Sequence, residues 1–109
     1  MCDDALGPWQ EGYDAWTCME AHIKALPADH FQTTLLTQII EVREALAEGD
    51  NLQAMREMND IISVTLNWMR SLPGVNQYSI RNVAENRAAI RYKGQVQSIF
   101  AKYKAKYGI

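Results

Sequence analysis

The sequence is poor in residues that interrupt helices. Its 109 residues include only three prolines and six glycines, and most of them fall between stretches of helical periodicity. No segment alternates apolar and polar residues with the period of two that is typical of a β-strand. The chain is therefore predicted to be all-α.

Long apolar runs and paired cysteines are also missing. No run approaches the roughly 18 residues that a membrane-spanning helix needs. The first ten residues, MCDDALGPWQ, are acidic and lack the basic and then apolar pattern of a secretory signal. Cys2 and Cys18 have neither a metal-type spacing nor a disulfide-rich setting, so we interpret them as reduced thiols. We expect a cytoplasmic protein without a membrane segment.

The length and the charge distribution indicate one domain with two unlike sides. Residues 1–109 are expected to form a single domain that buries about two-thirds of its surface, so a site built from several helices can need a second copy. The net charge is only −2, but every Asp and Glu except Glu85 lies in residues 1–60. Residues 78–109 are basic, with Arg81, Arg87, Arg91, Lys93, Lys102, Lys104 and Lys106. Because both halves carry apolar periodicity, we interpret this as a folded protein with an acidic and a basic side.

Apolar spacing predicts four helices, over residues 10–26, 29–48, 51–72 and 79–103. The expected breaks lie at Pro27, Gly49-Asp50 and Pro73-Gly74, with a kink at Gly94. Asp29 is the expected N-cap of the second helix. Core positions on the third helix are predicted for Met55, Met58 and Met69. The expected fold is a four-helix antiparallel bundle, completed by oligomerisation.

Two pairs of acids stand three residues apart on neighbouring expected helices. Glu41 and Glu44 share one face of the second helix, and Glu57 and Asp60 share one face of the third. Among the four, only Asp60 has a basic residue at helical spacing, which is Arg56. A short connection favours antiparallel packing, which would bring the pairs together. Clustered carboxylates of this kind suit Mg²⁺ or Mn²⁺.

The same four acids have a second interpretation as solvated surface residues. Acids on the outer face of a helix are common, and Glu41 and Glu44 lie away from the main apolar face of their helix. Two stacked like-charged pairs without local cations would, however, lower stability unless a cation bound there. Spacing alone leaves both interpretations open.

The acid motifs resemble a known family. The segment IEVREALAEGD, followed by REMNDII, is similar to the MazG-like all-α nucleoside triphosphate pyrophosphohydrolases, whose superfamily includes the dimeric dUTPases and phosphoribosyl-ATP pyrophosphohydrolase. Their pattern is EExxE, a spacer and ExxD on consecutive antiparallel helices. Glu41 to Glu44 and Glu57 to Asp60 match it, whereas Ile40 stands in place of the first Glu. The likeness covers residues 31–72 and, loosely, the C-terminal helix.

This resemblance implies an enzyme that hydrolyses nucleoside triphosphates to the monophosphate and pyrophosphate. Glu41, Glu44, Glu57 and Asp60 would be the catalytic metal ligands, with Mg²⁺ or Mn²⁺ as cofactor. The phosphate-facing candidates on the last helix are Asn86, Arg87, Arg91, Tyr92 and Lys93. Trp16 is a candidate for stacking on the base, although its helical spacing also suits a core position. The resemblance further implies a homodimer or homotetramer whose bundle is completed across chains.

Two other functions compete with this one. A non-catalytic helical protein that dimerises through the second and third helices would need neither metal nor turnover. A nucleic-acid binder using the basic C-terminal helix would show salt-dependent DNA binding, but the pI near 5.6 and the missing helix-turn-helix pattern argue against it. Lys102, Lys104 and Lys106 are interpreted as a solvated helix face. His22 and His30 have no neighbouring ligand types in the sequence.

Overall fold

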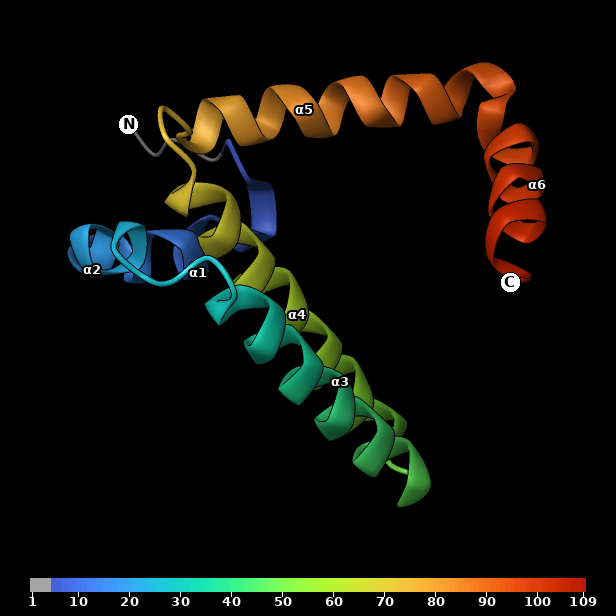
Figure 1. Ribbon diagram of the computed structural model, residues 1–109, viewed down its shortest axis with the longest axis horizontal. Helices are drawn as coiled ribbons and strands as arrows, with labels where there is room; N and C mark the ends of the chain where they lie inside the picture. Colours follow the sequence, from blue (N-terminus) through green and yellow to red (C-terminus); the bar gives the residue numbers. More distant parts are fainter. Residues whose placement is uncertain (1–4) are drawn as a thin grey trace.

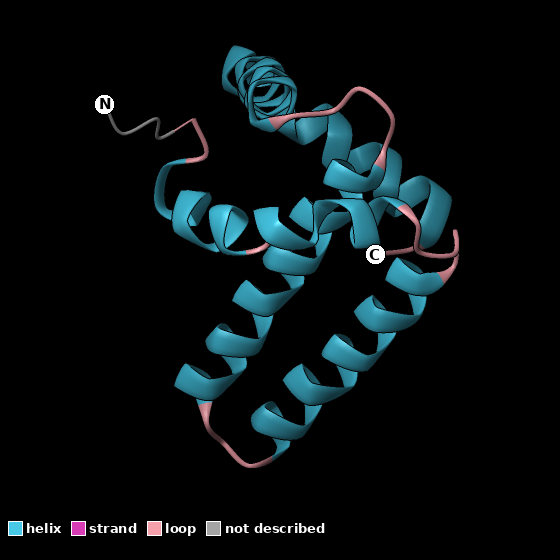
Figure 2. Ribbon diagram, turned by 90° about the vertical axis from the view of Figure 1, so that its left-hand side faces the viewer, coloured by secondary structure: helices cyan, strands magenta, loops and turns pink. Residues whose placement is uncertain are grey.

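The computed structural model describes residues 5–109, and these form helices without a β-strand, which confirms the all-α prediction (Figure 2). Cys2 lies outside the described residues. None of the described helices combines the length and apolar character that crossing a bilayer demands. In chain order the elements are η1 (Gly7–Trp9), α1 (Gln10–Ala15), η2 (Thr17–Met19), α2 (Glu20–Lys24), α3 (His30–Ala47), α4 (Asn51–Ser71), α5 (Gln77–Ile90), η3 (Arg91–Gln95) and α6 (Val96–Tyr107).

The N-terminal region is not the single helix predicted over residues 10–26. It breaks near Trp16, and α1 and α2 are separated by a 3-10 turn. Arg70 of α4 accounts for much of this packing, because its buried guanidinium donates to the Tyr13 carbonyl and lies 3.5 Å from the centre of the Tyr13 ring. Lys24 Nζ donates to the Arg70 carbonyl at 2.9 Å. Both short helices contact α4 in this arrangement.

Helices α3 and α4 form a long antiparallel hairpin (Figure 2). Gly49 adopts a φ of +75° in the turn between them, a conformation that glycine accommodates without strain. Asp50 then caps α4 by accepting from the Gln53 backbone N–H at 2.9 Å. At the other end, the Phe31 and Trp68 rings stack 6.0 Å apart. Asp29 occupies the N-cap of α3, but its side chain makes no capping bond.

The hairpin has one polar and one apolar flank, which follows from helical spacing. On the polar flank stand Thr34, Glu41, Glu57, Asp60 and Asn67. On the apolar flank stand Leu35, Ile39, Leu46, Met55, Met58 and Ile62. The predicted core positions Met55 and Met58 are wrong, because these side chains are 59% and 44% exposed. Only Met69 borders the small core around Tyr13, Leu66 and Ile80. No other described element covers the middle of the apolar flank.

Helices α5 and α6, called the C-terminal arm below (residues 77–107), lead away from the hairpin (Figure 1). Asn76 caps α5 through a capping box with Ser79, and Ile80 is the only buried residue of the arm. Gly94, at φ +86°, breaks the helix where a kink was predicted, and α6 turns off in a new direction. The radius of gyration is 16.1 Å, against about 13 Å for a compact chain of this length. The arm does not pack along α3 and α4, so one chain does not form the expected four-helix bundle.

Candidate carboxylate site

Glu41 of α3 and Glu57 of α4 face each other across the hairpin. A side-chain hydrogen bond with Glu57 raises the pKa of Glu41 above its ordinary value of 4.5, and the Glu57 charge raises it further. Partial burial and the nearby charges of Glu44 and Asp60 add to the same shift in the pKa. Glu41 is therefore close enough to interact with each of the other three acids singled out in the sequence.

Two glutamines that the sequence interpretation missed hold this arrangement. With its amide nitrogen toward the acids, Gln38 Nε2 donates to Glu41 Oε2 and Glu57 Oε2, each at 3.2 Å. Gln53 Nε2 donates to Glu57 Oε1 at 2.8 Å. Gln38 precedes Glu41 by three residues and Gln53 precedes Glu57 by four, so helical spacing was the available signal.

The four carboxylates make no ion pair within residues 5–109. The nearby Arg56 donates instead to the side-chain oxygen of Gln53, at 3.3 Å. Glu41 and Glu57 are half-buried, whereas Glu44 and Asp60 are exposed. The cluster is therefore a concentration of negative charge that no described side chain neutralises.

The donor chemistry fits a hard divalent cation, but the described residues do not form a finished coordination shell. Among them, no three carboxylate, imidazole or thiol groups converge as a set that could hold an ion. Carboxylate oxygens are the ligands that Mg²⁺ and Mn²⁺ prefer. Binding would require the exposed Glu44 and Asp60 side chains to turn toward the facing Glu41 and Glu57. Surface side chains change rotamer readily, so the geometry is compatible with such a movement.

Ile40, which replaces the first Glu of the family pattern, lies outside the cluster. Its side chain is exposed and borders a shallow hollow of about 380 Å³ together with Arg43, Glu44 and Ala47. Successive helical residues are separated by about 100°. A residue directly before Glu41 is thereby turned away from α4. Any metal role of the first family Glu has no counterpart at this position.

An aromatic cavity of about 280 Å³ opens on the polar flank of the same hairpin. It is lined by Trp16, His22, Ile23, Leu26, His30, Phe31, Thr34, Val64 and Asn67. Asn67 lies two turns, about 10 Å, from Asp60 along α4. Trp16 is 48% exposed at this cavity, so it is not a buried core residue. The two histidines, for which the sequence indicated no role, line it as well.

The phosphate-facing candidates do not meet the carboxylates of their own chain. Asn86 and Arg87 lie on α5, and Arg91, Tyr92 and Lys93 lie in η3, where the arm bends between α5 and α6 (Figure 1). All five are exposed, and Tyr92 is 93% exposed. The metal-binding and phosphate-facing candidates therefore do not form one cleft within a single chain. The physical reason is that α5 contacts α4 only near its own beginning.

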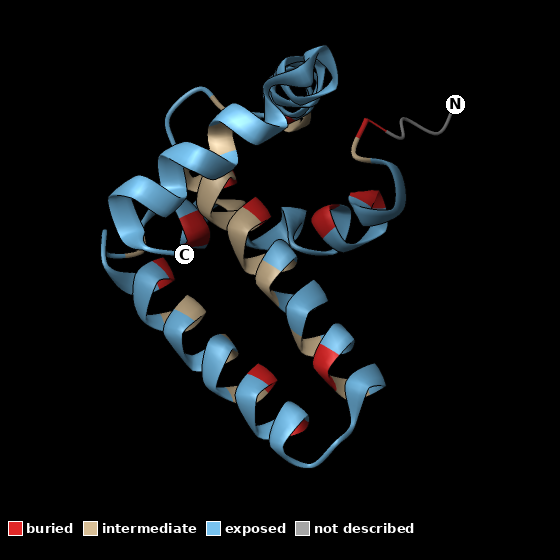
Figure 3. Cartoon of the chain, turned by 90° about the vertical axis from the view of Figure 1, so that its right-hand side faces the viewer, coloured by how far each residue is buried: buried red, intermediate tan, exposed pale blue. Residues whose placement is uncertain are grey.

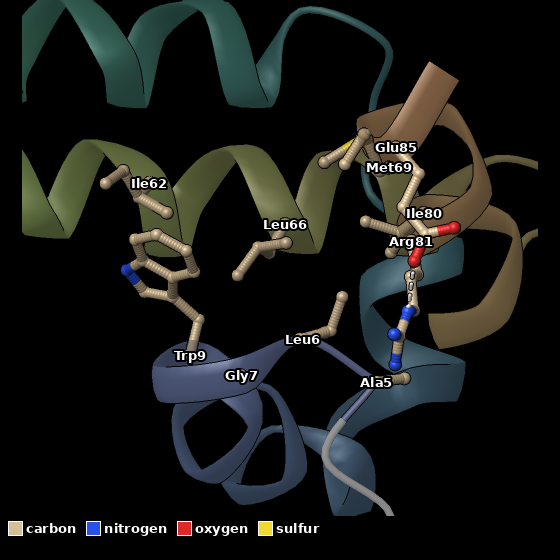
Figure 4. A pocket seen from close by; sticks show the side chains of 11 residues that line it. Ala5, Leu6, Gly7, Trp9, Ile62, Leu66, Met69, Ile80, Arg81 and Glu85 are labelled. Atoms are coloured by element: carbon tan, nitrogen blue, oxygen red, sulfur yellow. Dashed lines mark hydrogen bonds and ion pairs between the residues drawn. The ribbon is translucent and has the colours of Figure 1, made fainter. Parts of the chain in front are cut away.

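A larger cavity, of about 490 Å³, lies on the opposite side of α4 and does not belong to this site (Figure 4). Trp9, Ile62, Leu66 and Ala84 contribute to its mainly apolar lining. Its charged side chains, Arg81 and Glu85, pair with each other at 2.7 Å. Such a surface suits apolar contacts rather than metal or phosphate binding.

No protein family, curated protein or solved structure was found to match this chain. The likeness to MazG-like enzymes thus rests on the motif residues quoted above. A function has to be inferred from the residues themselves and from how the fold places them.

Proposed function

We propose that this protein is a metal-dependent pyrophosphohydrolase of ribo- or deoxyribonucleoside triphosphates, with a role in cleansing the nucleotide pool. The reaction would release the nucleoside monophosphate and pyrophosphate. One observation carries the proposal: of four acids on two antiparallel helices, Glu41 interacts with the other three, and none of the four forms an ion pair with a cation of residues 5–109. Bringing like charges together in this way lowers stability in the absence of a bound cation.

The carboxylates would hold the ion and the glutamines would position the carboxylates. Mg²⁺ or Mn²⁺ bound there would neutralise phosphate charge and lower the pKa of a bound water. Glu41 and Glu57 already face each other, and Gln38 bridges them with one amide nitrogen. Second ligands from the same two helices would be Glu44 and Asp60. The amide bridge fixes the carboxylate rotamers before the ion arrives, which favours binding.

The aromatic cavity supports a nucleotide as the substrate. It lies on the same flank as the carboxylates and about two helical turns away along α4, a separation comparable with that between a nucleobase and its phosphates. Trp16 and Phe31 offer rings for stacking, and Thr34 and Asn67 offer polar groups for the base edge. A base in this cavity would direct its phosphates toward the acids.

The decisive measurement is product release with matched variants. The protein is incubated with canonical and modified nucleotides plus Mg²⁺, and the products are separated by chromatography. We expect pyrophosphate from the wild type and none from Glu57→Gln or Asp60→Asn. Glu11→Gln removes an exposed acid of α1 and is expected to retain activity. Equal rates in all variants would sink the site assignment.

A second candidate is a non-catalytic helical protein that assembles through apolar faces. The exposure of the apolar side chains of Met55, Met58 and Phe100 favours it. It predicts no turnover with any nucleotide and no effect of Mg²⁺ on the melting temperature. The metal-dependent enzyme predicts a melting temperature that rises with Mg²⁺ in the wild type but not in a Glu41→Gln/Glu57→Gln variant.

A further inference from the structure

The single chain exposes more surface than a compact protein of its mass. Its accessible area is 8284 Å², whereas a folded monomer of 12.4 kDa is expected to expose about 6,100 Å². The excess is roughly 2,000 Å² per chain, and permanent homodimers bury about 2,000–5,000 Å² over both partners. The uncovered area is thus of the size that a stable dimer buries.

Two exposed apolar surfaces of the chain do not cover each other. One is the ridge of α6, where Val96, Phe100, Tyr103 and Tyr107 are exposed and a hollow of about 330 Å³ opens. The other is the apolar flank of the hairpin, whose two helices are exposed over much of their length (Figure 3), and it is continued by the cavity beside Trp9 (Figure 4). Soluble monomers seldom leave surfaces of this extent open.

The charges of the two regions are complementary. In residues 78–109 the only acid is Glu85, and it pairs with Arg81. The hairpin carries four acids that have no cation among the described residues. Since the arm leads away from the hairpin, its basic residues do not reach the four acids of their own chain.

We infer that a second copy of this chain supplies the basic half of the carboxylate site. The α6 ridge packs on the partner's apolar flank, and the segment before the Gly94 bend brings Arg87, Arg91 and Lys93 to the partner's acids. The phosphates of the substrate would lie between the two chains, where guanidinium forks fit phosphate oxygens. The role at the site rests on the proposed function, whereas the docking of the arm does not.

A complementation experiment tests the shared site. Glu57→Gln removes an acid, and Arg87→Ala/Arg91→Ala removes the basic pair, so each homodimer is expected to be inactive. After the two are co-expressed with different tags at equal amounts, half of the dimers are mixed. Each mixed dimer then has one intact site, and we expect about a quarter of the wild-type rate. Activity no higher than that of either variant alone would overturn the inference, provided that the wild type turns over.

A crosslinking experiment tests whether the arm of one chain docks on the hairpin of another, and it does not depend on catalytic activity. Protein is prepared from mixed ¹⁴N- and ¹⁵N-labelled chains and treated with a zero-length reagent that joins amines to carboxylates. We expect links from Lys93 to Glu44 or Asp60 in which the two peptides carry different labels. Links in which both peptides always carry the same label, or a monomeric mass at micromolar concentration, would overturn the inference. Mixed-label links in a wild type that hydrolyses no nucleotide would overturn the proposed function alone.

Two matched variants of α6 distinguish the loss of the dimer interface from the loss of the folded structure. Phe100→Asp places a charge on the ridge and is expected to give a monomer without mixed-label links. Ser98→Asp adds the same charge on the opposite face of α6 and is expected to keep the dimer. Circular dichroism checks that the two variants have the same total helix content and the same cooperative melting. An unchanged dimer in Phe100→Asp would remove α6 from the interface.

Discussion

Residues 5–80 and residues 81–109 differ in how their helices are held. Every buried side chain of the described chain lies in the first region, and none lies in the second. In the first region distant residues meet, as in the Lys24 bond to Arg70 and the stacking of Phe31 on Trp68. In the second, the ion pair of Arg81 with Glu85 joins residues only four positions apart.

This difference shows that, within one chain, the arm has little tertiary support beyond Ile80 at the beginning of α5. Isolated helices of about 12–15 residues are marginal in water, because nucleation is costly and packing supplies most of their stability. Helices α5 and α6, over Gln77–Ile90 and Val96–Tyr107, fall in that range. A second copy that covers the arm would give its helices the packing that residues 5–80 already have within one chain.

The largest expected effect concerns the carboxylates of the first region. Glu57→Gln should lower the rate of nucleotide hydrolysis by more than about 100-fold, because a bound metal supplies several kcal/mol of transition-state stabilisation. Steady-state pyrophosphate release measures it. Arg91→Ala, on the arm, should raise KM more than it lowers kcat if the arm mainly binds phosphate. A Glu57→Gln enzyme at half the wild-type rate would contradict the assignment.

The next largest effect is a difference between the two regions in how much a substitution lowers the free energy of unfolding. Arg70→Ala should lower the free energy of unfolding by about 3 kcal/mol, because it removes a buried side chain and leaves the Tyr13 carbonyl without its donor. Arg91→Ala removes an exposed side chain and should change the same quantity by no more than about 0.5 kcal/mol. Urea unfolding at low protein concentration measures both. Equal effects would mean that the two regions are not held differently.

A smaller effect is expected from the bend between α5 and α6. Gly94 has a φ of +86°, which costs an L-residue about 1–2 kcal/mol. Gly94→Ala should therefore favour a straighter arm and weaken self-association, which sedimentation or light scattering can measure. Gly12→Ala is the control, since Gly12 is helical with an ordinary φ and open space around it. Undiminished association in Gly94→Ala would show that the bend does not orient α6.

Sequence reasoning worked where local rules decide the outcome. The all-helical fold, the turn at Gly49-Asp50 and the break at Gly94 follow from propensity and turn chemistry. The nearness of Glu41 to Glu57 followed from three-residue spacing and a short antiparallel connection.

It failed where the outcome depends on contacts between distant residues. Residues 10–26 were expected to form one helix but form two short ones. Nothing in the sequence indicated that the buried Arg70 would bind the Tyr13 carbonyl and ring. Met55 and Met58 were predicted as core residues because they lie on an apolar face of α4. Apolar spacing identifies such a face but does not show whether another helix covers it. The direction of α6 could not be predicted from the sequence either, because it depends on the backbone torsion angles of Gly94.

The smallest effect is a pH dependence that originates in the first region. The hydrogen bond with Glu57, and then the neighbouring charges, raise the pKa of Glu41 above its ordinary value of 4.5. The folded state therefore holds its proton more tightly than the unfolded state. Without metal, stability should rise as pH falls from 7 through the raised pKa, and the gain should be complete near 4.5.

Glu41→Gln provides the comparison, since it removes both the titrating group and its repulsion with Glu57. This variant should melt at a higher temperature than the wild type at pH 7, and the difference should shrink toward pH 5. Glu11→Gln should follow the wild type at both values, because its charge is exposed on α1. Mg²⁺ should narrow the gap between wild type and Glu41→Gln at pH 7, since a bound cation offsets the same repulsion. A constant gap across the pH range would mean that Glu41 titrates as an isolated surface acid, and the four acids would then lose their common site.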